Sequence, residues 1–318
     1  MMKMFLKIVL LLFLESIFLS GVLGYSPERA GFTVLFKNQI NPYKVMSIFV
    51  LPKQELSLEV LEDINNNYKF IFDKARLTAI SGKKWKCEVP EQVGLYSAKV
   101  IKLGTSQEMM FNIFVMVPYD KLQGEYLDGY RIGKYPSFPL KNILPRYKPP
   151  EGFIKVTEVN KDIFLSPHLK LSQFLCKQIS GYPKYIVLQE ILLLKLELIL
   201  EKLNESGYQC NTFYILSGYR TPYYNKKIGN VAYSRHIWGG AADIFIDENP
   251  KDGYMDDLNK DGIINYNDAQ VIYDFIDSMY GKPWYELFIG GLGHYKKTSS
   301  HGPFVHVDVR GKRARWRG

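Results

Sequence analysis

Four of the five histidines in this chain of 318 residues lie between positions 236 and 306. His306 belongs to a run, 304–309, in which His306 and Asp308 alternate with three valines. A second run, 241–247, alternates small or polar side chains with apolar ones. A period of two is typical of a β-strand that presents one face to a core. The region therefore predicts neighbouring strands that carry polar, metal-binding side chains on one face.

The same region offers three ligands for one metal ion. If the two predicted strands are neighbours, Asp243 and His306 share a face. Gly239 and Gly240 let the preceding loop fold back, which brings His236 towards them. Two imidazoles and one carboxylate leave a fourth position of zinc open for water, which is the arrangement of catalytic rather than structural sites. Zinc in such a site lowers the pKa of water and polarises a scissile carbonyl group.

Three short motifs in this region resemble one known family. Ser-x-His-x-x-Gly-x-Ala-x-Asp, the signature of the zinc D-alanyl-D-alanine carboxypeptidases, is present from Ser234 to Asp243. Ser-Gly-Tyr-Arg-Thr-Pro at 217–222 and His-Val-Asp at 306–308 are similar to motifs of the same family, in the expected order. The resemblance covers residues 170–318, about half of the chain. It implies an α+β domain of the hedgehog/DD-peptidase type.

The resemblance also implies roles for individual residues. The zinc ligands are expected to be His236, Asp243 and His306. Arg220 is expected to hold the substrate, or the negative charge that develops on it, and Ser234 and Tyr219 complete the expected substrate-binding set. An ordinary ion pair is the alternative for Arg220.

The general base departs from the family pattern. Many relatives carry Glu or Asp three positions before the last histidine ligand, where this chain has Pro303. His301 and Asp308 are the candidates, and His301 is the first choice because some relatives carry a histidine ahead of the final ligand. Histidine exchanges a proton near neutral pH. Of the remaining histidines, His294 is expected in a surface loop and His168 in a structural role.

A second motif, at 257–268, has the spacing of a calcium-binding loop. The predicted calcium ligands are Asp257, Asn259, Asp261, Ile263 through its carbonyl group, Asn265 and Asp268. Aspartate at the twelfth position resembles the dockerin form of the loop, although dockerins carry two loops and this chain shows one. A structural calcium clip between the two zinc-ligand strands is therefore expected, and a turn without metal is the alternative.

The N-terminal residues have the pattern of a secretory signal peptide. Lys3 and Lys7 precede an apolar run, and small residues before Tyr25 offer a cleavage point, which predicts a signal peptide at 1–24. An uncleaved anchor is the alternative. We therefore expect an exported protein, periplasmic or extracellular and associated with the cell wall. The three cysteines are too few for a disulfide framework, and a Cys176–Cys210 bond is left open.

The net charge of +9 has a local concentration at the C-terminus. Five of the last nine residues are basic: Arg310, Lys312, Arg313, Arg315 and Arg317. An exported protein meets cell-wall and head-group polyanions first, so nucleic acid is not expected as a partner. A solvated basic tail is the simpler interpretation. After cleavage of the signal peptide no stable membrane span is expected, because no later apolar stretch reaches spanning length without charges.

Residues 27–118 favour an all-β sandwich. Short β-prone runs at 32–36, 46–51, 68–72 and 109–117 are separated by residues typical of turns. The stretch from Trp85 to Tyr96 resembles the later strands of an immunoglobulin-like module.

The rest of the chain divides at its prolines and glycines. A Pro- and Gly-rich linker is expected at 119–150 and the zinc peptidase domain at 151–318. Within that domain, the apolar stripe over 184–204 predicts a helix.

Together these features predict a zinc metallopeptidase that uses a zinc-activated water to hydrolyse a peptide bond in peptidoglycan stem peptides or cross-links. Both a D,D-carboxypeptidase and an endopeptidase fit. Pro303 favours the alternative of a non-catalytic cell-wall-binding protein that retains the zinc fold. A further alternative makes the β-sandwich, whose ligand is unknown, an adhesion domain.

Overall fold

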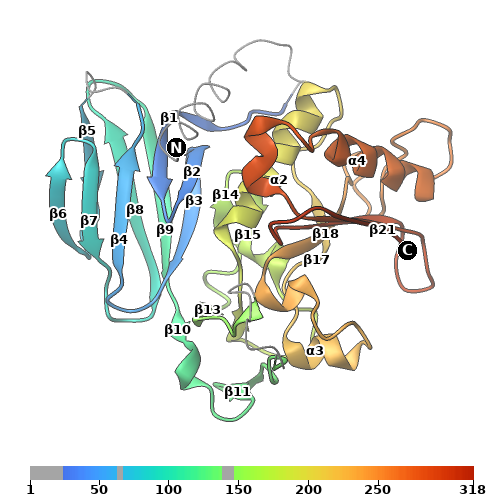
Figure 1. Ribbon diagram of the computed structural model, residues 1–318, viewed down its shortest axis with the longest axis horizontal. Helices are drawn as coiled ribbons and strands as arrows, with labels where there is room; N and C mark the ends of the chain where they lie inside the picture. Colours follow the sequence, from blue (N-terminus) through green and yellow to red (C-terminus); the bar gives the residue numbers. More distant parts are fainter. Residues whose placement is uncertain (1–23, 63–66, 138–146) are drawn as a thin grey trace. The chain divides into compact units, whose positions relative to one another are not determined.

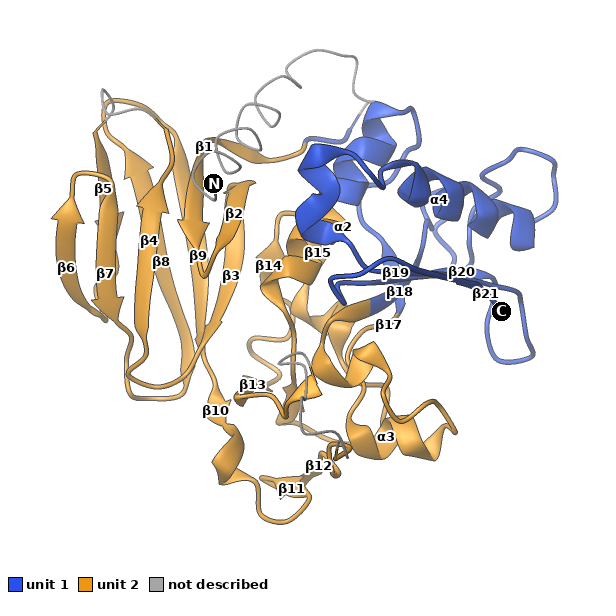
Figure 2. Ribbon diagram, in the orientation of Figure 1, with its two compact units in different colours: residues 1–26, 198–216, 242–318 blue, residues 27–197, 217–241 orange. Residues whose placement is uncertain are grey.

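The computed structural model describes residues 24–62, 67–137 and 147–318. The chain forms two compact units (Figure 2). Unit 1 comprises 1–26, 198–216 and 242–318, and unit 2 comprises 27–197 and 217–241. The predicted signal peptide lies, except for Gly24, outside the described residues. In the part of the chain that is described, no helix is long and apolar enough to cross a membrane.

The N-terminal part of unit 2 consists of two β-sheets (Figure 1). The first, in the order β2-β1-β4-β7-β6, contains β1 (Arg29–Phe36), β2 (Gln39–Tyr43), β4 (Glu55–Val60), β6 (Arg76–Ser81) and β7 (Lys84–Glu88). The second, in the order β3-β9-β8-β5, contains β3 (Val45–Val50), β5 (Tyr68–Ile71), β8 (Gly94–Lys102) and β9 (Glu108–Val115). The four runs expected to be strands overlap β1, β3, β5 and β9, and the last of them continues into β10 (Val117–Pro118).

The two sheets pack face to face because their strands alternate buried and exposed residues. In β4 the side chains of Leu56, Leu58 and Val60 are buried while those between them are not. Aromatic rings meet across the interface: Phe36 of β1 lies 6.2 Å from Phe111 of β9, measured between ring centroids. Such interdigitated inner faces are what hold a β-sandwich together.

Short elements connect the sandwich to the rest of unit 2. They are β10 (Val117–Pro118), η1 (Tyr119–Lys121), β11 (Tyr126–Leu127), β12 (Tyr130–Arg131), β13 (Gly152–Val156), β14 (Phe164–Ser166), β15 (Leu169–Lys170), η3 (Leu171–Phe174) and β16 (Lys184–Ile186). β10, β13 and β16 form a three-stranded sheet. In the expected linker at 119–150, the described residues Leu127, Tyr130 and Ile132 are buried.

A buried carboxylate also joins the sandwich to the start of α2 (Glu190–Glu205). Glu190 accepts hydrogen bonds from the Nζ of Lys37, at 2.6 Å, and from the backbone N–H of Phe49, at 3.0 Å. The predicted helix over 184–204 begins later, at Glu190, because Lys184–Ile186 pairs with β13 as a strand. α2 is buried on almost every side, and its buried residues include the charged Lys195, Glu197 and Glu201 as well as its leucines.

Unit 1 is built on a five-stranded sheet in the order β17-β18-β20-β19-β21. Its strands are β17 (Tyr214–Ser217), β18 (Ala241–Phe245), β19 (Gly291–Tyr295), β20 (Phe304–Asp308) and β21 (Ala314–Arg317). β19 pairs antiparallel with β20 and parallel with β21. The other elements of the C-terminal half are α3 (Pro222–Lys227), η4 (Arg235–Trp238), α4 (Tyr266–Ser278) and η5 (Pro283–Phe288). The protein is therefore a mixed α+β structure.

Candidate metal centre

Strands β18 and β20 position a carboxylate and an imidazole in the interior. Every residue of both strands is buried. Alternation along β20 places His306 and Asp308 on one face and Val305 and Val307 on the other. The Nδ1 of His306 lies 2.8 Å from the Oδ1 of Asp243. Asp243 and His306 therefore meet, although 63 positions separate them in the chain.

His236 lies on the short helix η4, and its ring is oriented by the backbone. Its Nδ1 donates a hydrogen bond to the carbonyl oxygen of Gly218, at 2.7 Å. Gly239 ends η4 with φ of 62°, and a Cβ there would lie 2.1 Å from the carbonyl oxygen of Val187, so the turn requires glycine. A proton on Nδ1 leaves the lone pair on Nε2, which is the form in which histidine binds a metal.

His236, Asp243 and His306 form a group that could hold a metal ion. One ligand atom from each lies within 4.8 Å of the others, and all three residues are buried. Two imidazoles and one carboxylate are the donor set of catalytic zinc, and buried charges of this kind persist when paired or bound to a metal. The residues present therefore fit zinc.

The charges around His306 are strongly coupled. Burial alone would lower the pKa of His306, but hydrogen bonds to Asp243 and Asp308 outweigh burial and raise it. Burial alone would raise the pKa of Asp308, but His306 and Arg310 hold that carboxyl well below its usual range. Asp308 is 0 % exposed, and it also accepts a hydrogen bond from the backbone N–H of Gly291, at 2.7 Å. Asp308 is thus a fixed anion beside the imidazole.

The three residues predicted to bind substrate, Arg220, Ser234 and Tyr219, are all buried. Arg220 is 9 % exposed, its Nε donates to the Oγ of Ser217 at 2.8 Å, and its backbone N–H donates to the carbonyl oxygen of His236 at 3.3 Å. Ser234 is buried at the residue before η4. Tyr219 is 1 % exposed, and its hydroxyl shares a hydrogen bond with that of Tyr135, at 3.2 Å. Tyr219 is therefore enclosed beside Tyr135, and its role in substrate binding stays a prediction.

The remaining histidines have different surroundings. His301 is half-buried in the loop before β20, where its Nδ1 lies 2.8 Å from the carbonyl oxygen of Gly302 and its ring packs edge-on to Phe304. The expectation of a surface loop for His294 is wrong, because it lies in β19 with 0 % exposure and donates from Nε2 to the carbonyl oxygen of Tyr266. His168 has the buried carboxylate of Glu197 2.7 Å from its Nδ1.

The oxygen atoms of the predicted calcium loop face the loop's own backbone. The carboxylate of Asp257 accepts hydrogen bonds from the N–H groups of Asp261, at 3.2 Å, and Gly262, at 2.8 Å. Gly262 has φ of 81° and so makes the expected sharp turn. Asn265 and Asp268 form a capping box at the start of α4. These contacts stabilise the turn, and they keep the oxygens gathered in one loop.

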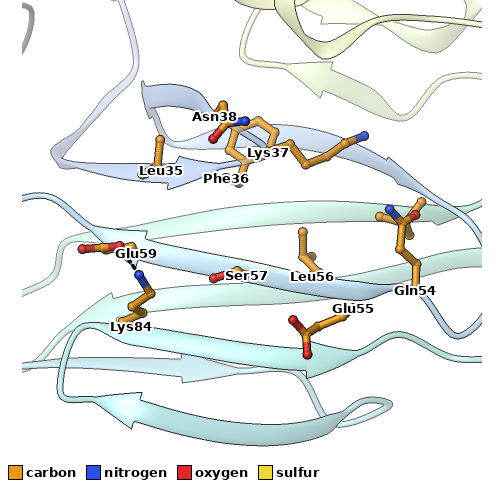
Figure 3. Close-up of a pocket in the computed structure, with 11 residues that line it drawn as sticks. Leu35, Phe36, Lys37, Asn38, Gln54, Glu55, Leu56, Ser57, Glu59 and Lys84 are labelled. Carbon is orange, nitrogen blue, oxygen red and sulfur yellow. Dashed lines mark hydrogen bonds and ion pairs between the residues drawn. The ribbon is translucent and has the colours of Figure 1, made fainter. Parts of the chain in front are cut away.

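A separate cavity lies on the β-sandwich (Figure 3). It has a volume of about 340 Å³ and is lined mainly by residues of β1 and β4 and the loops next to them. Glu59 and Lys84 form an ion pair in it, at 2.7 Å. It contains none of the residues predicted from the sequence to be functional.

Sequence reasoning missed several residues that support the candidate ligands. The carbonyl group of Gly218 orients His236, and Arg310 neutralises Asp308 through a bond from Nε to Oδ2, at 2.8 Å. Trp316 packs against His306, with ring centroids 5.2 Å apart. The sequence held one signal for Trp316. The glycines of β19 have no side chains, which indicates that side chains from elsewhere fill the space on that face.

Solved structures similar to parts of this chain include single protein domains. The structure "Crystal structure of titin M3 domain" is 9% identical, covers 26% of this chain and 97% of that chain, and has a TM-score of 0.18. "IG27 protein domain" is 15% identical, with 22% and 83% covered and a TM-score of 0.16. At these scores the likeness carries no argument. A comparison with curated proteins gives no match.

A family model matches the part of the chain that carries the motifs. The match to the model described as Peptidase M15 spans residues 167–262, which include Arg220, His236 and Asp243 but not His306. Peptidases of this family depend on zinc, and the buried His-Asp-His group supplies a donor set for it. Residues 167–262 are therefore similar to the Peptidase M15 family of zinc peptidases.

Proposed function

We propose that this protein is an exported zinc metallopeptidase that hydrolyses a peptide bond in peptidoglycan stem peptides or their cross-links. The observation that supports it best is the buried group of His236, Asp243 and His306, two of which lie inside the matched M15 segment. Zinc bound there supplies Lewis-acid chemistry to a substrate carbonyl group.

The protein's own residues prepare the site before substrate arrives. The carbonyl oxygen of Gly218 fixes the proton of His236 on Nδ1. Asp308, held by Arg310, lies 3.3 Å from the Nε2 of His306 and orients that ring. Arg220 is tied by its backbone to His236, and its guanidinium is the group that we assign to a substrate carboxylate or to developing negative charge.

Proton transfer is assigned to His301 rather than to Asp308. The carboxylate of Asp308 is fully buried, accepts hydrogen bonds from Arg310 and Gly291, and has a pKa far below its usual range, so it is a weak proton acceptor. His301 is half-buried in a loop next to β20. Within this proposal, movement of that loop over a bound substrate would bring the imidazole of His301 to the leaving amine.

The test is mass spectrometry of muropeptides after incubation with the zinc-loaded protein. Release of D-alanine identifies a carboxypeptidase, and conversion of cross-linked dimers to monomers identifies an endopeptidase. Either reaction should stop when a chelator removes the metal. If the wild type cuts neither class, the non-catalytic cell-wall-binding protein replaces the proposal, and sedimentation with insoluble peptidoglycan then measures that binding. Fractionation of producing cells tests export separately.

We also propose calcium as a structural ion of the loop at 257–268. The oxygen atoms of Asp257, Asn259 and Asp261 are gathered around Gly262 by hydrogen bonds that span two to five residues. Hard oxygen donors at these loop positions are what calcium prefers. The ion would fix the start of α4, the helix that packs on β19 and β20.

A further inference from the structure

Three residues form a row across the sheet of unit 1. In the strand register Gly293 of β19 is opposite His306 of β20 on one side and opposite Trp316 of β21 on the other. Directly paired residues share a face of the sheet. Gly293 has no side chain, and a Cβ there would lie 2.4 Å from the Nε1 of Trp316. The indole therefore occupies the space above Gly293 and reaches the imidazole, with ring centroids 5.2 Å apart and planes at 49°.

A second glycine extends this space. A Cβ on Gly291 would lie 2.4 Å from the Oδ2 of Asp308, 2.8 Å from Cη2 of Trp316 and 2.9 Å from the Nε of Arg310. Gly291 and Gly293 are two apart in β19, so both point to the face that carries His306. The two glycines thus leave a trough that the side chains of Trp316, Arg310 and Asp308 fill.

Polar contacts hold the indole at its edge and over its face. Trp316 donates from Nε1 to the hydroxyl of Tyr295, at 2.7 Å. The guanidinium of Arg310 lies over the indole, 5.1 Å from its centroid, and donates from Nε to the carboxylate of Asp308. Asp308 in turn lies beside the Nε2 of His306. One side of the imidazole therefore has a continuous support made of Trp316, Arg310 and Asp308.

We propose that Trp316 is a positioning residue for His306. By packing against the ring and holding Arg310 on Asp308, it keeps the imidazole in one orientation before a metal arrives. A ligand held in place loses less side-chain entropy on binding, and supporting contacts of this kind change metal affinity about 10- to 100-fold. The inference rests on the proposed function, because it takes His306 to be a zinc ligand.

The experiment measures metal binding rather than peptidase activity. Zinc affinity is determined by competition with a chromophoric chelator, and ligand geometry by the visible absorption spectrum of the Co²⁺-substituted protein. We expect Trp316→Leu to weaken zinc binding by about tenfold or more and to change the Co²⁺ spectrum. Tyr295→Phe, which removes only the acceptor of the indole N–H, should weaken binding by a smaller factor.

Trp284 provides a matched control. It is half-buried like Trp316 and belongs to unit 1, but it lies on η5 beside Lys202 and Tyr285. Trp284→Phe should therefore leave affinity and spectrum at wild-type values, whereas Trp316→Phe should fall between the wild type and Trp316→Leu.

Three outcomes would overturn the inference. A folded Trp316→Leu variant with wild-type zinc affinity would do so, as would weakened binding with an unchanged Co²⁺ spectrum, which is the mark of a general loss of stability. If Trp316→Leu does not fold, wild-type zinc affinity in Tyr295→Phe would contradict the inference. Failure of the proposed function is distinguishable: a wild type that binds zinc but cuts no muropeptide leaves the effect of Trp316 on zinc affinity measurable, whereas a wild type that binds no zinc removes the premise that His306 is a ligand.

Discussion

His236 donates a hydrogen bond from Nδ1 to the carbonyl oxygen of Gly218, and the two atoms are 2.7 Å apart. Gly218 approaches Phe174 so closely that a Cβ would lie 2.6 Å from its Cα, so this carbonyl group is fixed in place. The bond links the Ser-Gly-Tyr-Arg motif to the Ser-x-His motif, which 18 positions separate. The first motif therefore acts on the metal site through its backbone as well as through Arg220.

The first prediction concerns the metal. His236→Ala and His306→Ala should each abolish stoichiometric zinc, because two remaining ligands hold the ion poorly. Elemental analysis of the purified variants measures this, and His168→Ala, which removes a histidine paired with Glu197, should keep its zinc. Stoichiometric zinc in either ligand variant would exclude that residue from the site.

The second prediction concerns calcium. Asp257→Ala and Asp261→Ala should remove a calcium-dependent rise in melting temperature and leave the melting temperature in chelator less affected, because the ion stabilises only the form that it binds. Thermal unfolding with and without calcium measures the difference. Asp252→Ala, an acidic residue outside the loop at 257–268, is the control. If calcium does not stabilise the wild type, the loop is a turn held by its own hydrogen bonds.

The third prediction concerns pH and the C-terminal arginines. Burial alone would raise the pKa of Asp277, but Arg315 and Arg313 outweigh it and lower the pKa. A depressed carboxyl pKa stabilises the fold at pH values above the unfolded value of about 3.9, and the stabilisation is lost as the pH falls through the folded value. Asp277→Asn should therefore cost about 1 kcal/mol near neutral pH.

Urea unfolding at several pH values tests this prediction. The gap in unfolding free energy between the wild type and Asp277→Asn should shrink as the pH falls below about 4. Asp274→Asn, on the same helix, is the matched change, since Asp274 contacts Gln270 and not the arginines. A gap that stays constant down to acid pH would show that the ion pairs contribute nothing.

Local periodicity predicted the candidate metal ligands but not the residues that hold those ligands in place. The alternation in 304–309 and the spacing from Ser234 to Asp243 follow from strand and turn geometry, which short stretches of sequence encode. The start of α2 at Glu190 could not be predicted in this way, because Lys184–Ile186 becomes a strand only by pairing with β13, about thirty residues earlier.

The C-terminal basic cluster shows the same limit. Composition favoured a solvated tail, but Ala314–Arg317 is the strand β21, paired with β19. Arg313 and Arg315 form ion pairs with Asp277, and Arg310 with Asp308. Asp277 is 36 and 38 positions from Arg313 and Arg315, so only the fold could reveal that these two charges are paired.

The glycines at 290, 291 and 293, just before His294, favour a surface loop when the sequence is considered alone. In β19 those glycines instead leave room for side chains from β20 and β21, and His294 points to the other face, where its ring stacks on Tyr266 with centroids 3.5 Å apart. A glycine run thus signalled close packing rather than exposure.

The last prediction separates the two candidates for the general base. Hydrolysis of a peptide bond needs a group that accepts a proton from the attacking water and donates one to the leaving amine. Asp308 is fully buried and already bound to Arg310, His306 and Gly291, so its replacement should disturb the ligand that it orients. Asp308→Asn should therefore weaken zinc affinity as well as turnover.

His301→Ala should act differently, because His301 contacts Gly302 and Phe304 and belongs to no predicted ligand set. We expect it to keep full zinc and to lose about 10²-fold or more in turnover, which is the usual contribution of a general acid–base residue. Turnover of muropeptides at saturating zinc, measured beside metal content, tests both variants. Near-wild-type turnover in His301→Ala, with Asp308→Asn inactive yet fully loaded with zinc, would reverse the two assignments.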